Sequence, residues 1–265
     1  MISGARLILI SILVAFLSVA CPSPGAVHSP PAGWVEISPP TDEEGWTCAN
    51  WSRDAWRVES DGTGSNMWIQ RAEPKSREIV LPLQDGRLIG MNQGEFGGAI
   101  AWEATGASER MVILQGNPVA FVTSPSGVFV AEGLAHLSLS QGRLLQLIWA
   151  GERWNVKNVV DLGAAPQAVT LVGPTTLLIV TTDGVTEVDL DKRVAIPVFT
   201  NKRWVSLYGN SIVRLSSGAI LIGMRRAVIK LSPTATGFTE RWWVPSSCPR
   251  LRKTSKVVTC ECVNN

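Results

Sequence analysis

Four stretches of this 265-residue chain repeat one pattern, and the repeat restricts the possible folds more than any other feature. Each stretch has a short apolar run, a turn glycine, a second apolar run, a tight loop and a third run of alternating character. Short runs separated by turn residues are typical of β-strands, so the repeat predicts an all-β fold. The turn glycines are 41, 46 and 45 residues apart, and they are Gly86, Gly127, Gly173 and Gly218. The second loops contain Gly98, Gly133, Gly184 and Ala227.

Units of about 40–45 residues with up to four short strands resemble the blades of a β-propeller. The resemblance covers residues 76–245 and is generic, because neither a Trp-Asp register nor a full kelch signature is present. Residues 34–75 are rich in tryptophan and look like one more, degenerate unit, which gives about five blades. We expect the C-terminal strand, residues 256–263, to complete a blade begun by the N-terminal segment. A β-sandwich is the alternative, and no stretch after residue 20 shows sustained helical periodicity.

The first 20 residues have the composition of an export signal. Arg6 is the only charged residue before position 36, and the apolar run that follows it is too short to span a bilayer. The segment Leu17–Cys21 resembles the lipobox of bacterial lipoproteins, although its leucine lies one place earlier than usual. The resemblance implies that Cys21 is acylated and becomes the first residue of the mature chain. A plain secreted form and an uncleaved anchor are the alternatives.

Two further segments follow the signal. Residues 21–33 are rich in Pro, Gly and Ser and cannot build a core, so they predict a tether. Residues 34–265 form the expected domain, which includes a cysteine-containing closing segment, residues 248–265. Removing Arg6 with the signal leaves 23 basic residues against 22 acidic ones. This balance gives no reason to expect a nucleic acid as the partner.

Four cysteines remain once Cys21 is set aside, and an even number in an oxidising compartment predicts disulfides. Cys260 and Cys262 are too close in the sequence to bond to each other without strain. Both remaining pairings, which also use Cys248, join Cys48 to the C-terminal segment. We therefore expect two disulfides that clasp the ends of the domain, with a four-cysteine zinc site as the alternative.

The sequence contains no cluster with the spacing of a catalytic or metal site. His28 lies in the tether, and His136 lies within a third strand, where a structural role is expected. A Gly-x-Ser-x-Gly elbow, a His-Glu-x-x-His motif and a complete phosphate-binding loop are all missing. We therefore predict no catalytic residue, no metal and no cofactor, although distant carboxylates could still form a pair in three dimensions.

Loops are where function is usually found on a rigid scaffold. In a propeller, the loops between the second and third strands would lie together on one face. Here they carry chemically varied side chains, which suit a protein partner: Gln93, Glu95, Phe96, Glu132, Asp183, Arg225 and Arg226. The sequence thus predicts a lipid-anchored envelope protein, facing the periplasm or the surface, that acts as a non-catalytic protein-binding, scaffold or immunity-type inhibitor module. The alternative is a protein that binds or processes extracytoplasmic glycans, through some of its 11 tryptophans and a carboxylate pair in the central depression.

Overall fold

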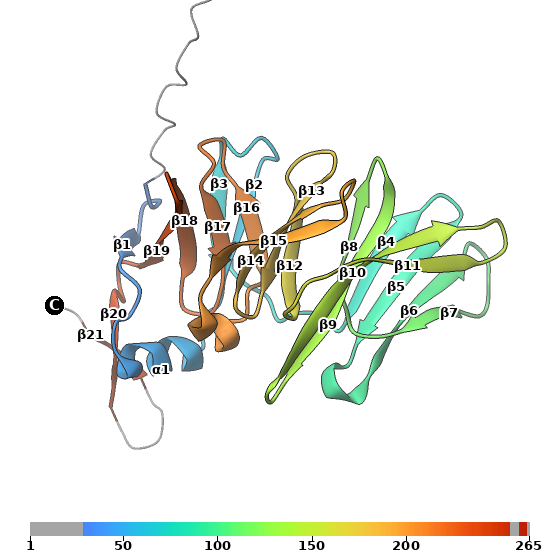
Figure 1. Ribbon diagram of the computed structural model, residues 1–265. Coiled ribbons are helices and arrows are strands. Elements are labelled where there is room, and N and C mark those ends of the chain that lie inside the picture. The colour runs from blue at the N-terminus through green and yellow to red at the C-terminus, as the bar shows by residue number, and fades with distance from the viewer. Residues whose placement is uncertain (1–28, 255–259, 264–265) are drawn as a thin grey trace, which may run out of the picture.

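The computed structural model describes residues 29–254 and 260–263. The predicted signal, Cys21 and the tether up to residue 28 lie outside these residues. The regular structure of the described chain consists mainly of small antiparallel sheets, so the all-β prediction is confirmed (Figure 1). In this part of the chain, no helix has the length and apolar character needed to cross a membrane.

Each of the four sequence repeats forms one antiparallel sheet whose strands are neighbours in chain order. The repeat predicted three strands per unit and allowed a fourth, and the structure has all four. The predicted turn glycines Gly127 and Gly218 have φ angles of 126° and 83°, which only glycine adopts readily. In chain order, the strands are β4 (Glu78–Leu83), β5 (Gly86–Asn92), β6 (Gly98–Ala104), β7 (Met111–Gln115); β8 (Pro118–Ser124), β9 (Gly127–His136), β10 (Leu139–Trp149), β11 (Trp154–Asp161); β12 (Pro166–Leu171), β13 (Thr176–Thr181), β14 (Gly184–Asp189), β15 (Val194–Thr200); and β16 (Ser211–Arg214), β17 (Ile220–Gly223), β18 (Val228–Thr234), β19 (Gly237–Pro245).

The N-terminal strand adds a fifth strand to the last of these sheets. β1 (Trp34–Ile37) pairs antiparallel with β19, at its outer edge. The Glu36 carboxylate on β1 accepts hydrogen bonds from Trp243 Nε1 at 2.9 Å and from Lys230 Nζ at 3.1 Å. These contacts join two ends of the chain that are about 200 residues apart, and β1, rather than the C-terminal strand, completes the sheet.

Two hairpins lie outside the four sheets. β2 (Trp56–Ser60) pairs with β3 (Met67–Arg71), and β20 (Arg250–Lys253) pairs with β21 (Cys260–Val263). The expectation that the C-terminal strand would pair with the N-terminal segment is therefore wrong, because β21 pairs with β20. The degenerate unit expected at residues 34–75 contributes only the hairpin β2–β3 as a sheet of its own.

Two disulfides fasten the C-terminal hairpin. Cys48 pairs with Cys260 at a Cα–Cα distance of 5.6 Å, and Cys248 pairs with Cys262 at 5.1 Å. The predicted clasp is confirmed, and the structure selects one of the two pairings that the sequence left open. The cysteines therefore form bonds to one another rather than a zinc site.

A short helix, α1 (Glu43–Trp51), interrupts the otherwise all-β chain. Its N-cap is Asp42, whose carboxylate accepts a hydrogen bond from the backbone N–H of Gly45 at 2.6 Å. Glu43 and Glu44 lie in the first turn, where acidic side chains stabilise a helix. The sequence analysis predicted no helix here, and the capping residue followed by acidic residues was the signal it missed.

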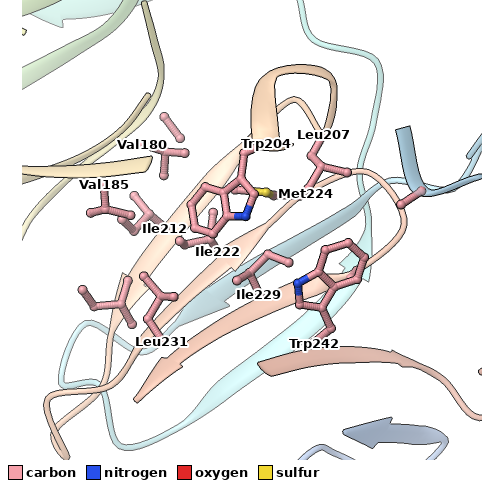
Figure 2. Packing of buried hydrophobic residues seen from close by; sticks show 14 of the residues in the cluster. Val180, Val185, Trp204, Leu207, Ile212, Ile222, Met224, Ile229, Leu231 and Trp242 are labelled. Carbon is pink, nitrogen blue, oxygen red and sulfur yellow. The ribbon is translucent and has the colours of Figure 1, made fainter. Parts of the chain in front are cut away.

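The core consists of four apolar clusters, one between each pair of neighbouring units. They lie between the sheets β4–β7 and β8–β11, between β8–β11 and β12–β15, between β12–β15 and the last sheet, and between that sheet and the hairpin β2–β3. In the third cluster, Trp204 and Trp242 lie among Ile222 and Ile229 (Figure 2). Both indole N–H groups donate to Glu240, at 3.1 and 2.7 Å, so the buried rings keep their polar atoms satisfied. The units are thus stacked face to face in series.

The first strand of each unit contacts the first strand of the next unit. β4 contacts β8, β8 contacts β12, β12 contacts β16, and β16 contacts β2. The five first strands therefore lie side by side, and the later strands of each sheet lie farther from them. This arrangement positions both features described next: the loops at one end of the sheets, and a cavity among the first strands.

Candidate interaction face and central cavity

The loops between second and third strands gather at one end of the sheets, together with the helices. We call this end the loop face, and it comprises residues 92–97, 136–139, 181–184 and 224–227. The helices α1 and η2 (Lys202–Ser206) lie along the same, lower edge in Figure 1, as do η1 (Gly94–Phe96) and the end of β9. The first two of these loops touch, because His136 Nε2 lies 2.7 Å from a Glu95 carboxylate oxygen. The strand topology thus brings loops from two neighbouring units together.

Three predicted face residues lie in the first of these loops, and all are exposed. Gln93 precedes η1, and its backbone N–H donates to the carbonyl of Gly97 at 2.9 Å, which closes the loop. Glu95 contacts His136 of the next unit. The Phe96 side chain is 83 % exposed, although it is large and apolar.

Asp183 and Arg225 are half-buried on the loop face, and each is held by local contacts. The Asp183 carboxylate accepts from Thr181 Oγ1 at 2.9 Å. The Arg225 guanidinium lies 4.6 Å from the centre of the Tyr208 ring and donates to the carbonyl of Asn50 at the end of α1. Arg225 therefore connects the fourth sheet to the helix, and only part of its surface is available to a partner.

Glu132 lies inside the molecule rather than on the loop face, with 8 % of its surface exposed. Its carboxylate accepts from Arg143 Nε at 2.5 Å and from the backbone N–H of Asn117 at 3.2 Å. The sequence analysis placed the loop at Gly133, but β9 continues to His136. A Cβ on Gly133 would lie 2.4 Å from the carbonyl oxygen of Gln141, so the glycine permits a close approach of two strands instead of a turn.

Arg226 is also buried, with 3 % of its surface exposed. Its guanidinium donates to the carbonyl of Cys248, and its backbone N–H donates to the carbonyl of Asp54 at 2.7 Å. Desolvation by burial lowers the pKa of Arg226. Arg226 therefore holds the start of the disulfide-bonded C-terminal segment and is not available as a surface residue.

The structure adds apolar residues to the loop face that the sequence analysis did not select. Leu137, in the turn between β9 and β10, is 93 % exposed and has a φ of 52°. Beside the loop face, Trp51 ends α1, and Val205 and Tyr208 lie in and after η2; all three are more than half exposed. Leu137 lies four residues after Gly133, where the sequence predicts the loop. Exposed apolar side chains gathered at one end of a domain are typical of an interaction site.

A second feature is a cavity of about 890 Å³ among the first strands. Its walls include residues from all five of these strands, and its size is that of a site for a small molecule. The walls contributed by β4, β8, β12 and β16 are largely apolar and include Ile79, Val119, Val169 and Ile212. The wall contributed by the hairpin β2–β3 is polar and includes Arg57, Glu59, Trp68 and Gln70. The cavity is therefore open space between one polar wall and several apolar ones.

The polar wall is organised around the Glu59 carboxylate. Arg57 Nε donates to one oxygen at 2.6 Å, and the indole N–H of Trp68 donates to the other at 3.0 Å. The hydrogen bond from Arg57 is the main reason that the pKa of Glu59 lies below its ordinary value. Glu59 therefore remains ionised at neutral pH, which is unsuitable for a general acid in glycoside hydrolysis.

Lys75 lies at the same cavity, in the link between β3 and β4. Its Nζ donates to the backbone carbonyl of Gln167 at 3.0 Å. The residue is exposed, and desolvation by neighbouring protein atoms lowers the pKa of Lys75. No carboxylate among residues 29–254 and 260–263 forms an ion pair with it.

The described part of the chain brings no three histidine, cysteine, aspartate or glutamate side chains together as a set of metal ligands. No protein-family model and no curated protein sequence matches the chain.

Proposed function

We propose that this protein is an exported, lipid-anchored β-propeller of about five units that binds another protein through its loop face. The serial stacking of the sheets and the adjacency of their first strands support the propeller. The hairpin β2–β3 would be the fifth unit, placed between the last sheet and the first. The two disulfides support export, because such bonds persist in oxidising compartments.

One observation carries the binding function: Phe96 and Leu137 are 83 % and 93 % exposed in loops of neighbouring units that contact each other. Burying a large apolar side chain is favourable by about 1.5–3 kcal/mol relative to leaving it in water. A partner that covers both would recover this free energy. The Glu95–His136 pair beside them supplies polar groups that would fix the orientation of the partner.

The alternative of a glycan-processing site has less support. The cavity contains an exposed tryptophan, Trp68, and the carboxylates of Glu59 and Glu73. However, both oxygens of Glu59 are already occupied by hydrogen bonds from Arg57 and Trp68. The protein is therefore proposed to act by binding rather than by acid–base catalysis at this wall.

Photo-cross-linking in whole cells tests the proposal. A photoreactive amino acid at Leu137 should give one discrete adduct with another protein. The matched control is Ile196 on the outer strand β15, which is 56 % exposed but lies away from the loop face. Equal adducts from both positions, or none from Leu137, would contradict the proposed face.

A further inference from the structure

We propose that the Cys248–Cys262 disulfide is a site of thiol–disulfide exchange, which an extracytoplasmic dithiol reduces while the Cys48–Cys260 disulfide stays intact. The two bonds fasten the same C-terminal hairpin, but their surroundings differ. The inference concerns the cysteines and their contacts, so it does not depend on the binding of a protein partner.

The two disulfides differ in how easily a thiolate can reach them. Cys262 is an exposed residue of β21, and it is bonded to Cys248, which is 7 % exposed. In the other bond, Cys48 is completely buried in α1 and Cys260 is half-buried. Exchange requires direct attack of a thiolate on one of the sulfur atoms, so access governs its rate. Cys262 is therefore the residue that an external thiol should attack first.

Reduction of this bond takes two steps. A thiolate of the dithiol attacks Sγ of Cys262, the bond between the two sulfur atoms breaks, and Cys248 leaves as a thiolate that takes up a proton. The second thiol of the reductant then attacks the mixed disulfide and releases Cys262 as a thiol. Two electrons pass from the dithiol, which becomes a disulfide, to the bonded cysteines, which become two thiols.

The C-terminal hairpin should stay attached to the domain after this bond opens. The Cys48–Cys260 disulfide would still join β21 to α1, and the backbone N–H of Lys253 donates to the Glu44 carboxylate at 2.9 Å. Cys248 and Cys262 are only 14 residues apart, so loss of their bond adds less freedom to the unfolded chain than loss of the long-range bond. Reduction should therefore change the structure locally rather than unfold it.

The local change should reach the loop face through Arg226. Its guanidinium is buried and donates to the backbone carbonyl of Cys248. The backbone N–H of Cys248 donates to the carbonyl of Pro245 at 2.9 Å, which forms a turn directly after β19. The bond to Cys262 holds this turn in place. Opening the bond would therefore weaken the support of the loop 224–227.

Limited reduction of the full mature chain tests the proposal. The oxidised protein would be treated with dithiothreitol under native conditions, quenched with iodoacetamide and mapped by peptide mass spectrometry. We expect Cys248 and Cys262 to be alkylated at least about tenfold faster than Cys48 and Cys260, because a buried bond reacts only when the structure opens. With glutathione, a monothiol, the mixed disulfide should form on Cys262, and Cys248 should be the alkylated thiol.

Hydrogen exchange tests the connection to the loop face. The backbone N–H of Arg226, which donates to the carbonyl of Asp54, should exchange faster after reduction. The backbone N–H of Gln93 closes the first loop of the same face, and its unchanged exchange serves as the control. The double variant Cys248→Ser with Cys262→Ser should show the same difference without any reductant.

Three results would overturn the proposal. Cys48 and Cys260 could be alkylated as fast as the other pair, glutathione could attach to Cys248 instead of Cys262, or hydrogen exchange at Arg226 could stay unchanged after reduction. All three are measured on the wild-type protein, so they decide the question even if the serine variant does not fold. None of them depends on cross-linking at the loop face, so failure here leaves the proposed protein-binding function intact.

Discussion

Removing the two disulfides separately should destabilise the domain by different amounts, because they close loops of very different length. Cys48 and Cys260 are 212 residues apart, whereas Cys248 and Cys262 are 14 apart. In the chain-entropy model, the loop term gives about 5 kcal/mol for the long loop and about 3 kcal/mol for the short one. The long-range bond should therefore contribute about 2 kcal/mol more to the free energy of unfolding.

The comparison requires two double variants, Cys48→Ala with Cys260→Ala and Cys248→Ala with Cys262→Ala. Alanine suits these sites because Cys48 and Cys248 are both buried. Urea unfolding at equilibrium would give the free energy of each variant relative to the wild type. The C-terminal hairpin also has native contacts outside the bonds, such as the hydrogen bond from the Lys253 backbone N–H to Glu44 at 2.9 Å, which neither pair of substitutions removes directly.

Equal losses in the two variants, or a larger loss on removal of the short loop, would refute this reasoning. Either result would mean that strain or contacts of the native state, rather than the entropy of the unfolded chain, determine what the disulfides contribute. Removal of the long-range bond should also make the unfolded state less compact than removal of the short-range bond does. The urea m-value should therefore increase in the variant without the long-range bond.

Three further predictions concern the sheet edge, a glycine and the anchor. Burial raises the pKa of Glu36, but hydrogen bonds from Trp243 and Lys230 outweigh this effect, so the pKa lies below its ordinary value. The contribution of Glu36 to the free energy of unfolding should therefore be complete above the ordinary glutamate pKa and be lost as the pH falls through the lowered pKa. Glu36→Gln should cost about 1–2 kcal/mol at pH 7 and flatten this acid dependence in urea titrations, and an unchanged pH profile would contradict the role of the pair. Gly133→Ala should cost about 1–3 kcal/mol by calorimetry, because its Cβ would clash with backbone, whereas Gly173→Ala, with open space around it, should be nearly neutral; equal effects would show that Gly133 is an ordinary turn residue. Cys21→Ala should abolish labelling with radioactive palmitate and release the protein from membranes, and persistent labelling would refute the lipobox.

The repeats could be predicted because their signals are local. Gly86, Gly127 and Gly218 mark tight turns between strands that are adjacent in the sequence, and apolar runs on either side of each turn identify the strands. Trp204, Trp242 and Trp243 are at most 1 % exposed, as large apolar rings in the core of a β-rich domain are. The sheets could therefore be predicted from the pairing of strands that are adjacent in the sequence and from the apolar composition of those strands.

Long-range pairing could not be predicted, because nothing near β1 specifies its partner. Trp34 lies opposite Pro245, and the contacts that fix this register come from Lys230 and Trp243 on other strands. The sequence alone offers many strands of similar composition for such an edge. The cysteine pattern predicted only that Cys48 bonds to the C-terminal segment. The structure shows that its partner there is Cys260.

Only part of the candidate site could be predicted from the sequence, because the rest depends on contacts between distant segments. Residues in the short loop between β5 and β6, such as Phe96, are exposed as expected. Glu132 is buried because Gly133 permits the close approach of two strands, which in sequence looks the same as a turn glycine. Arg226 is buried because it donates to the carbonyl of Cys248, a contact with a distant segment that the sequence does not reveal. The cavity was beyond sequence analysis, since Lys75, Trp68 and Val169 come together only through the packing of separate units.

Affinity for the captured partner tests the central claim most directly, namely that the loop face binds a protein. The measurement compares the wild type with Phe96→Ser/Leu137→Ser and with a control, Val112→Ser/Ile196→Ser, which removes exposed apolar side chains from outer strands. We expect a loss of at least about 100-fold for the loop-face variant, as for two interface hot spots, and less than about threefold for the control. An unchanged affinity for the loop-face variant, or an equal loss in both, would contradict it.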